Sequence, residues 1–490
     1  MSNIIITKKD EAHIKLICEP SVEQELHSHF SFDAPGARFH PKFRSKVWDG
    51  KIHMYSLFTK ELYFGLKPYV KHFAEVNNYS IEDNAPEVSD YVTKDDVVNF
   101  CKELKISSKE EQLEVRDYQY NAIFKAIKEG RKLLLSPTGS GKSLIIYACM
   151  RWHLKNSRKI LIIVPTTSLV EQLYSDFQDY SFFNQWKASY NCYRIYGTVE
   201  KTTDMPVTIS TWQSIHKLPK KFFDSYDVIF GDECHLFKAK SLTTIMNKCK
   251  SAPYRIGTTG TLDDSKIHRL ILEGLFGTVL KTTTTKNLIE NKQLADLKIY
   301  VILLKYSEEI CKQNKQLSYQ QEMDYLVQNV KRNTFIKNLT LKQKGNSLVL
   351  FQFVEKHGKS LYDMICVKDR KVFLVYGDTD TKQRENIRKI TEKEHNAIII
   401  ASYGTFSTGI NIKNLHNIIF ASPSKSKIRN LQSIGRGLRI GDNKVSCNLY
   451  DIGDDMTWRT RNNYTLLHMK ERIKMYSDEK FDYKFIKVEV

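Results

Sequence analysis

A glycine-rich octapeptide between an apolar run and a helical pattern constrains the fold of this chain most strongly. The sequence Ser136-Pro-Thr-Gly-Ser-Gly-Lys-Ser143 follows the strand-like run 132–135 and precedes a helical pattern over 144–154. A glycine-rich turn in that position exposes backbone N–H groups at the positive end of a helix dipole, where they can surround phosphate oxygens. The order of strand, turn and helix therefore predicts a phosphate-binding loop in a parallel α/β sheet.

The residues of this loop have expected roles in binding ATP. Lys142 is expected to reach the β- and γ-phosphates, and Ser143 to supply a hydroxyl to Mg²⁺. The predicted nucleotide-binding residues of the loop are Thr138, Gly139, Ser140, Gly141, Lys142 and Ser143. The first position of such loops is usually Gly or Ala, and here it is Ser136. The alternative is an ordinary Gly/Ser turn followed by a lysine.

An acidic pair separates ATP hydrolysis from the other chemistries that use such loops. Asp232-Glu233-Cys234-His235 follows the apolar run 227–230, and Asp232 comes 90 residues after Lys142. Asp232 is predicted to hold Mg²⁺ through its water shell, and Glu233 to orient and deprotonate the attacking water. Cys234 and His235 could suggest zinc, but no second ligand pair lies nearby in the sequence. A solvated acidic loop is the other alternative.

Strand-like apolar runs alternate with helical patterns from about 113 to 280, and again after a helical stretch at about 317–345. This alternation is typical of βαβ units and parallel sheets. We therefore expect an α/β protein with two parallel-sheet domains at 101–290 and 291–490, the second ending in a helix. A small α+β domain over 1–100 is expected to precede them, and the acidic stretch 81–90 is interpreted as a surface linker or loop.

The charge balance indicates the class of partner. Lysine and arginine total 75, aspartate and glutamate 56, and the formal net charge is +19. A surplus of this size favours nucleic acid or an anionic membrane surface. No basic amphipathic anchor stands out, so nucleic acid is the expected partner and a membrane is not. The alternative is charge that serves only solubility.

Cysteine usage and hydropathy indicate the compartment. The nine cysteines include no C-x-x-C pair, which argues for reduced thiols rather than disulfides or a zinc site. No apolar run approaches the roughly 18 residues of a membrane helix, and the amino-terminal segment has no cleavable signal pattern. We expect a soluble intracellular protein.

Seven further short segments carry polar residues beside strand-like runs. They are LEVRDYQ (113–119), IVPTTSLVEQ (163–172), STWQS (210–214), GTTGT (257–261), LFQF (350–353), ASYGTFSTGIN (401–411) and LQSIGRGLR (431–439). Together with the phosphate loop and the acidic pair, they resemble the ordered motifs of superfamily 2 helicases and translocases. The resemblance covers about 113–455 and implies two tandem RecA-like domains, with ATP and Mg²⁺ as cofactors.

The resemblance also implies roles for individual residues. Arg116 and Gln119 would recognise adenine. Gln432 would contact the attacking water, Arg439 would stabilise charge on the γ-phosphate, and Arg436 would be its partner. The residues that would grip nucleic acid are Thr166, Thr167, Thr211, Gln213 and Thr405. The residues that would couple hydrolysis to movement are His235, Thr259, Thr261 and Gly409.

Three details of these motifs bear on the expectation. Arg436 and Arg439 are expected on one helix face, from which they would reach across the cleft between the two domains. Gly260 stands where the family usually has Ala, which is expected to loosen the coupling between hydrolysis and movement. Asn411 stands where many relatives place Asp.

The whole chain also resembles the recombination helicases of T-even-type phages. The resemblance includes Phe39-x-Pro41, Trp48-Asp49-Gly50 and the ending SDEKFDY (477–483). It implies an ATP-driven 3′-to-5′ motor on Holliday junctions, forks, D-loops and R-loops, serving recombination, repair and replication control. It further implies a monomer in the cytoplasm of an infected host cell. Its partners would be single- and double-stranded DNA, RNA–DNA hybrids and single-strand-binding or recombination proteins.

The amino-terminal segment interleaves cations with aromatic side chains. The cations are Arg38, Lys42, Arg44, Lys46 and Lys51, and the aromatic residues are Phe39, Phe43 and Trp48. Cations with stacking aromatics fit a duplex or junction contact, for which Arg44 and Lys46 are the candidates. Alternatively, the aromatic residues pack a small core and the cations form its solvated rim.

Other functions remain as alternatives to a DNA helicase. An RNA helicase or a duplex DNA translocase of the same superfamily would share every motif. A nucleic-acid-binding protein with an inactive motor is disfavoured because the residues of the ATP site are intact. A small-molecule kinase is disfavoured by the second α/β domain.

Overall fold

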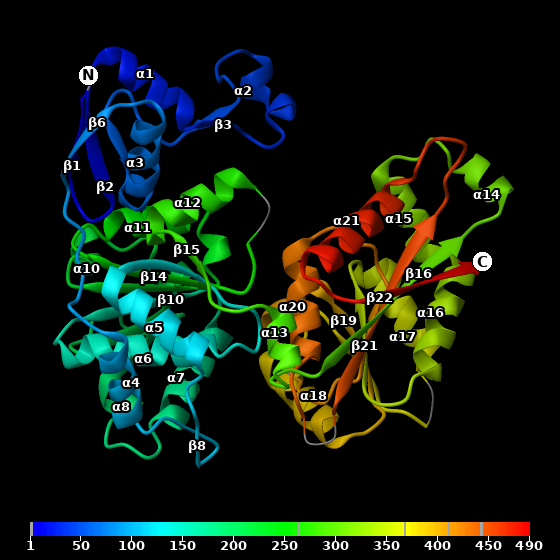
Figure 1. Cartoon of the computed structure of the whole chain (residues 1–490). Helices are drawn as coiled ribbons and strands as arrows, with labels where there is room; N and C mark the ends of the chain where they lie inside the picture. Colours follow the sequence, from blue (N-terminus) through cyan, green and yellow to red (C-terminus); the bar gives the residue numbers. More distant parts are fainter. Residues whose placement is uncertain (1–2, 239, 263–264, 367–368, 410–411, 442–443) are drawn as a thin grey trace. The chain divides into compact units, whose positions relative to one another are not determined.

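The structure, a computed structural model, describes residues 3–238, 240–262, 265–366, 369–409, 412–441 and 444–490. The chain divides into two compact units, residues 1–136 with 141–282 and residues 283–490 with the short segment 137–140 (Figure 1). No helix among the described residues is long and apolar enough to cross a membrane.

The amino-terminal domain is built on a mixed sheet of four strands in the order β5-β2-β1-β6. Its elements are β1 (Asn3–Lys8), β2 (His13–Ile17), α1 (Pro20–His29), β5 (Glu61–Tyr63), the 3-10 helix η2 (Phe64–Leu66), α3 (Lys67–Val76) and β6 (Ser80–Asn84). β1 pairs antiparallel with β2 and parallel with β6. Alternate residues of β1, Ile4 and Ile6, enter the core, as expected for a strand with one buried face. The predicted α+β domain is confirmed.

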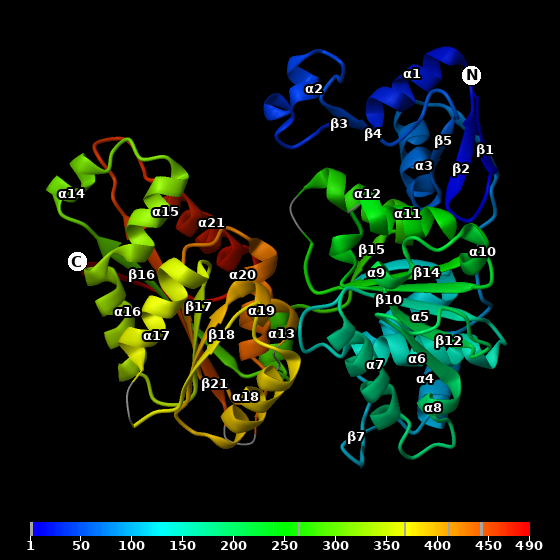
Figure 2. The ribbon, with the colours of Figure 1, turned by 180° about the vertical axis from the view of Figure 1, so that it is seen from behind.

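A hairpin extends from this domain. β3 (Ser31–Asp33) pairs antiparallel with β4 (Lys51–His53), and η1 (Ala37–Phe39) and α2 (Pro41–Arg44) lie between them. Figures 1 and 2 show this hairpin, residues 31–53, projecting away from the four-stranded sheet.

The predicted linker 81–90 is partly wrong. Its first residues form β6, which pairs with β1 at the sheet edge. Its last residue, Asp90, accepts hydrogen bonds from Arg158 at 2.7 Å, Trp152 at 3.0 Å and Tyr254 at 2.6 Å. Although burial raises the pKa of Asp90, these donors hold it well below its usual range. The end of the stretch is therefore anchored on the following domain.

The domain that follows contains seven parallel strands in the order β11-β12-β10-β13-β14-β9-β15. The strands are β9 (Arg131–Leu135), β10 (Ile160–Val164), β11 (Cys192–Ile195), β12 (Val207–Thr211), β13 (Val228–Asp232), β14 (Tyr254–Thr259) and β15 (Val279–Lys281). The helices are α4 (Lys94–Glu103), α5 (Asp117–Glu129), α6 (Lys142–Lys155), α7 (Thr167–Tyr180), α8 (Ala188–Asn191), α9 (Trp212–Ile215), α10 (Lys220–Phe223), η3 (Cys234–Lys238), α11 (Lys240–Lys248) and α12 (Lys266–Phe276). A small hairpin, β7 (Ser107–Ser108) with β8 (Glu111–Gln112), precedes α5.

Helices cover both faces of this sheet (Figure 1). Every residue of β10 is buried, with Ile160 and Ile162 in the core beneath α5 and α6, and Leu161 and Ile163 in the core beneath α11 and α12. Burial on both faces explains why β10 has a continuous apolar sequence.

The second unit contains another sheet of seven parallel strands, in the order β18-β19-β17-β20-β21-β16-β22. The strands are β16 (Asp296–Lys305), β17 (Ser347–Phe351), β18 (Val372–Val375), β19 (Ile398–Ser402), β20 (Asn417–Phe420), β21 (Ser446–Asp455) and β22 (Tyr483–Glu489). The helices are α13 (Thr285–Glu290), α14 (Glu308–Gln313), α15 (Tyr319–Gln328), α16 (Val330–Lys342), the π-helix η4 (Val354–Gly358), α17 (Lys359–Ile365), α18 (Thr381–Lys393), α19 (Tyr403–Gly409), α20 (Lys427–Gly437) and α21 (Tyr464–Asp478). The prediction of two tandem parallel-sheet domains is confirmed.

Candidate ATP site and nucleic-acid surface

The phosphate loop joins the end of β9 to the start of α6. Ser136 N donates to Thr259 O at 2.8 Å, and Ser140 Oγ donates to Pro137 O at 2.7 Å. Gly139 and Gly141 have φ angles of 84° and 81°, in the left-handed region that favours glycine. Thr138 lies in the same turn. The backbone therefore turns sharply into the helix, as the sequence predicts.

Gln119 lies directly against this loop. It is buried near the start of α5, where its Oε1 accepts a hydrogen bond from Arg116 N at 2.9 Å. A Cβ atom on Gly141 would overlap Gln119 Nε2. Arg116 Nη1 donates to Tyr118 OH at 2.9 Å. The structure thus brings the predicted adenine-recognition segment against the predicted phosphate loop.

Lys142 and Ser143, the first residues of α6, have partners on two sides. Lys142 Nζ donates to Ser136 O at 3.3 Å and lies 3.9 Å from Glu233 Oε1. Ser143 Oγ lies 2.8 Å from the hydroxyl of Tyr180, the last residue of α7. The sequence patterns did not indicate Tyr180. The structure joins the lysine of the loop to the acidic pair.

The acidic pair lies at the carboxyl end of β13. Asp232 is buried, and its Oδ1 accepts hydrogen bonds from Thr258 Oγ1 at 2.7 Å and Glu233 N at 2.9 Å. Burial and the neighbouring Glu233 charge raise the pKa of Asp232, and the Lys142 ammonium opposes that rise. Glu233 has a φ of 48°, which is uncommon for a residue with a side chain.

A chain of polar contacts continues from Glu233 to the end of β14. His235 Nδ1 lies 3.3 Å from Glu233 Oε2 and 3.0 Å from Thr259 Oγ1. Thr259 Oγ1 in turn donates to Thr261 O at 2.9 Å. Three of the four residues predicted to couple hydrolysis to movement, His235, Thr259 and Thr261, are therefore in contact one after another, and Gly260 does not interrupt these contacts.

The two predicted nucleic-acid segments of this domain end adjacent strands. Val164 and Thr211 are paired across β10 and β12, and Gln213 Nε2 donates to Pro165 O at 3.2 Å. Thr166 caps α7, its Oγ1 accepting a hydrogen bond from Leu169 N at 3.3 Å. Thr211 is buried and hydrogen-bonded to Ser214. Thr167 and Gln213, by contrast, are exposed members of the predicted nucleic-acid-binding set.

Thr405 and Gly409 lie on α19 in the second unit. Thr405 is buried, and its hydroxyl accepts a hydrogen bond from Ser402 Oγ at 2.8 Å. Gly409 is the last residue of the helix, and Asn411 lies outside the described residues.

The glutamine and the two arginines of segment 431–439 are on or just beyond α20. Gln432 is half-buried on the helix, and the Arg436 guanidinium lies 5.6 Å from the centre of the Phe406 ring. The expectation that both arginines share one helix face is wrong, because α20 ends at Gly437 and Arg439 follows it. The buried ammonium of Lys444 donates to Gly437 O, where the next helical N–H would otherwise bind.

The hairpin 31–53 contains the cations and the aromatic residues that the sequence analysis singled out. Phe43 packs against Gly50, and Trp48 Nε1 donates to Lys51 O at 2.8 Å, so each ring is half-buried against the backbone of the hairpin. Phe39 is instead 79% exposed. Among the described residues, no ion pair involves any of the five exposed cations, which are Arg38, Lys42, Arg44, Lys46 and Lys51.

Three family models match successive parts of the chain. The N-terminal model of the DNA helicase UvsW matches residues 3–83, the model of the type III restriction enzyme res subunit matches 112–264, and the helicase conserved C-terminal domain matches 330–441. These matches cover the amino-terminal domain and parts of both parallel-sheet domains.

Individual relatives and solved structures agree with the models. The ATP-dependent DNA helicase UvsW of Enterobacteria phage T4 is 36% identical over 494 residues, which cover 97% of each chain. The DNA 3′-5′ translocase XPB2 of Sulfurisphaera tokodaii is 22% identical over 68% of this chain and 81% of the relative. The crystal structure of T4 UvsW matches 99% of both chains with 34% identity and a TM-score of 0.54. The chain therefore belongs to the family of the ATP-dependent DNA helicase UvsW, within superfamily 2.

Proposed function

We propose that this protein hydrolyses ATP to unwind or branch-migrate branched nucleic acids, including Holliday junctions, forks, D-loops and R-loops. The proposal of ATP-driven movement is supported by one observation, the series of contacts from Lys142 through Glu233 and His235 to Thr259 and Thr261. Through these contacts, a conformational change at the phosphate site can reach the end of the neighbouring strand β14. Family membership and the unpaired cations of the hairpin 31–53 support the branched substrate.

The ATP site contains the groups that hydrolysis requires. Glu233 would orient and deprotonate the attacking water, and Lys142 would stabilise the phosphate charge. Asp232 and Ser143 offer carboxylate and hydroxyl oxygens, the ligands that Mg²⁺ prefers, so the donor set fits this ion. When bound, Mg²⁺ neutralises charge on the β- and γ-phosphates. Arg116 and Gln119 would hold the adenine.

The second unit would complete the site. Arg439 and Arg436 would stabilise the charge of the transferring phosphate when the domains close, and Gln432 would contact the attacking water. Nucleic acid would be gripped by backbone amides and hydroxyls in the segments that contain Thr166, Thr167, Thr211, Gln213 and Thr405. His235, Thr259, Thr261 and Gly409 would couple hydrolysis to movement.

The remaining parts of the proposal concern organisation. The functional domains would span 1–100, 101–290 and 291–490. The protein would act as a monomer in the cytoplasm of an infected host cell. Its substrates would include single- and double-stranded DNA and RNA–DNA hybrids, with single-strand-binding or recombination proteins as further partners.

Unwinding of matched substrates tests this function. A four-way DNA junction, a linear DNA duplex of equal length and the corresponding RNA duplex are incubated with protein and ATP. We expect the junction to be resolved at least about tenfold faster than either duplex, a difference of roughly 1.4 kcal/mol in barrier. Resolution of the RNA duplex alone would contradict the proposal, as would equal rates on all three substrates.

The hairpin cations provide a separate prediction. Replacing Arg44 and Lys46 by Gln is expected to weaken junction binding about tenfold and to reduce the slope of log K against log salt by about 2. The matched control replaces Lys102 and Lys105, which are also exposed; Lys105 and Lys46 both have positive φ angles. Fluorescence anisotropy across a salt series measures both quantities. Equal losses in the two double variants would exclude a specific contact by the hairpin.

A further inference from the structure

Two buried cations from outside α20 hold the ends of this helix. Arg472 of α21 contacts the segment that enters α20, and Lys444 contacts the segment that leaves it. Each side chain is almost completely buried. Burying a charge costs free energy unless the charge is paired or hydrogen-bonded, so the partners of these two cations show which parts of the fold they stabilise.

Arg472 joins the entry of α20 to the strand β21. Its Nε lies 2.8 Å from Asp451 Oδ1, and its Nη2 lies 2.7 Å from the same oxygen. Tyr476 OH donates to Asp451 Oδ2 at 2.9 Å. The remaining nitrogen, Nη1, donates to Ser424 O at 3.1 Å, three residues before the helix begins. The ion pair with Asp451 therefore fixes the Arg472 guanidinium, which in turn binds the backbone just before α20 begins.

The same entry segment is bound from other directions. Asn430 Nδ2 of α20 also donates to Ser424 O, at 3.3 Å, and Tyr403 OH of α19 donates to Ser422 O at 3.1 Å. The Ser422 hydroxyl lies 2.9 Å from Nδ1 of the buried His357. Groups from several elements thus leave this segment with little freedom.

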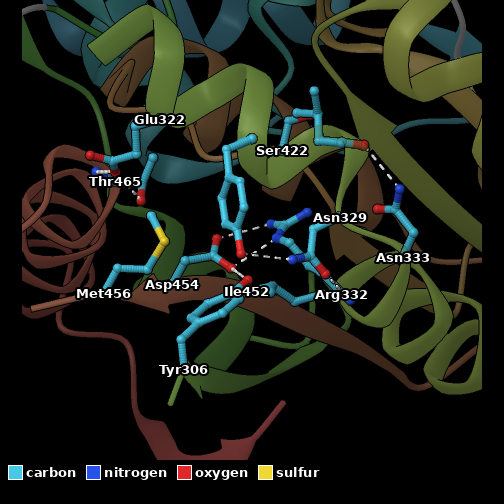
Figure 3. A network of polar contacts seen from close by, with 12 residues as sticks. Tyr306, Glu322, Asn329, Arg332, Asn333, Ser422, Ile452, Asp454, Met456 and Thr465 are labelled. Carbon is cyan, nitrogen blue, oxygen red and sulfur yellow. Dashed lines mark hydrogen bonds and ion pairs between the residues drawn. The ribbon is translucent and has the colours of Figure 1, made fainter. Parts of the chain in front are cut away.

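A second buried ion pair lies on the same strand. Arg332 of α16 donates to Asp454 at 2.8 and 3.1 Å, and Tyr306 OH donates to Asp454 at 2.9 Å (Figure 3). Both members of the Arg332–Asp454 pair are fully buried. Because Asp451 and Asp454 are three residues apart, they point to opposite faces of β21, and an arginine holds each face.

Lys444 performs the corresponding role at the helix exit. Its Nζ donates to Gly437 O, to Arg439 O at 3.1 Å and to Lys413 O at 3.2 Å. No carboxylate among the described residues pairs with it. Burial lowers the pKa of its ammonium to about 8. All three of its hydrogen atoms are committed to backbone carbonyls, one of them the carbonyl of Arg439.

We propose that Arg472 and Lys444 are positioning residues that set the orientation of α20 and Arg439 for ATP hydrolysis. The inference rests on the proposed roles of Arg436 and Arg439. Arginines that stabilise a transferring phosphate must be held within a fraction of an ångström, and rigid supporting contacts provide that accuracy. Nucleotide binding is expected to depend little on either cation, because their hydrogen-bond partners lie outside the phosphate loop, and Lys142, Ser143 and the acidic pair belong to the other unit.

Steady-state kinetics of two variants provide the test. Arg472→Lys keeps the charge but loses the planar fork, and Lys444→Met keeps the length but loses the ammonium. Each is expected to lower DNA-stimulated kcat by about 10- to 100-fold while the KM for ATP changes less than about twofold. Lys470→Met, at an exposed position of α21, is the matched control and should behave as the unchanged protein. Unchanged kcat in both variants would overturn the inference.

A double-variant cycle separates positioning from general stability. If Arg472 acts through Arg436, Arg472→Lys should have little further effect on kcat in an Arg436→Ala background. Full additivity would mean that Arg472 acts only on folding, and would overturn the inference.

If Arg436→Ala alone leaves kcat unchanged, the proposed arginine role fails and the inference with it. If Arg436→Ala lowers kcat but Arg472→Lys and Lys444→Met leave kcat unchanged, the positioning inference fails and the proposed role of Arg436 stands. Thermal melting identifies a variant that does not fold, and the other variant then carries the test.

Discussion

Lys142→Ala is expected to abolish ATP hydrolysis, lowering kcat by about 10³-fold or more while leaving junction binding nearly unchanged. Lys142 Nζ lies between Ser136 O of the phosphate loop and Glu233 Oε1 of the acidic pair. Its removal takes away the positive charge that would face the β- and γ-phosphates. The nucleic-acid segments after β10 and β12 do not use it, so binding of DNA should persist.

Phosphate release and anisotropy with a labelled junction measure the two effects. Lys155→Ala is the matched control, because this lysine ends the same helix and is exposed. It should leave hydrolysis unchanged. ATP turnover within a few-fold of normal in Lys142→Ala would show that the phosphate site has been assigned to the wrong residues.

Arg436→Ala is expected to have the next largest effect, a loss on the order of 10³-fold in kcat with ATP affinity largely retained. An arginine that stabilises charge only in the transition state changes kcat rather than ground-state binding. In the structure, the Arg436 guanidinium lies near Phe406 at the last turn of α20. The same result is expected for Arg439→Ala, because the Arg439 side chain is proposed to stabilise charge on the γ-phosphate.

Binding of a fluorescent ATP analogue, measured alongside turnover, separates the two quantities. Arg461→Ala, at an exposed position of the same unit, is the control for loss of a positive charge. A variant of Arg436 that loses ATP affinity and kcat in equal proportion would contradict a role confined to the transition state.

The parallel sheets were predictable because their strands are buried on both faces. β10 is apolar throughout, β13 begins with Val-Ile-Phe and β9 ends in three leucines, and such apolar runs are the pattern of strands buried on both faces. β6 was not predictable in this way. Its sequence, Ser-Ile-Glu-Asp-Asn, is mostly exposed at a sheet edge and resembles a linker in composition. Only its pairing with β1 makes it a strand.

The candidate site was predictable where local sequence determines it. The phosphate loop, Asp232-Glu233 and the threonines at the end of β14 lie at the ends of recognisable strands, and parallel strands bring such ends to one edge. Contacts between side chains from distant segments were not predictable. Tyr180 beside Ser143 and Thr258 on Asp232 depend on helix packing and strand register. Arg472 and Lys444 gave no local signal, because their partners are backbone carbonyls and residues of other elements.

ATP hydrolysis measured without nucleic acid, and then with single-stranded DNA, a four-way junction or matched RNA, tests the central claim most directly. A motor whose phosphate site is linked to its nucleic-acid segments should turn over slowly alone. We expect DNA to stimulate it at least about tenfold, with the junction among the best activators. Stimulation by RNA alone, or no stimulation by any of these nucleic acids, would contradict the account.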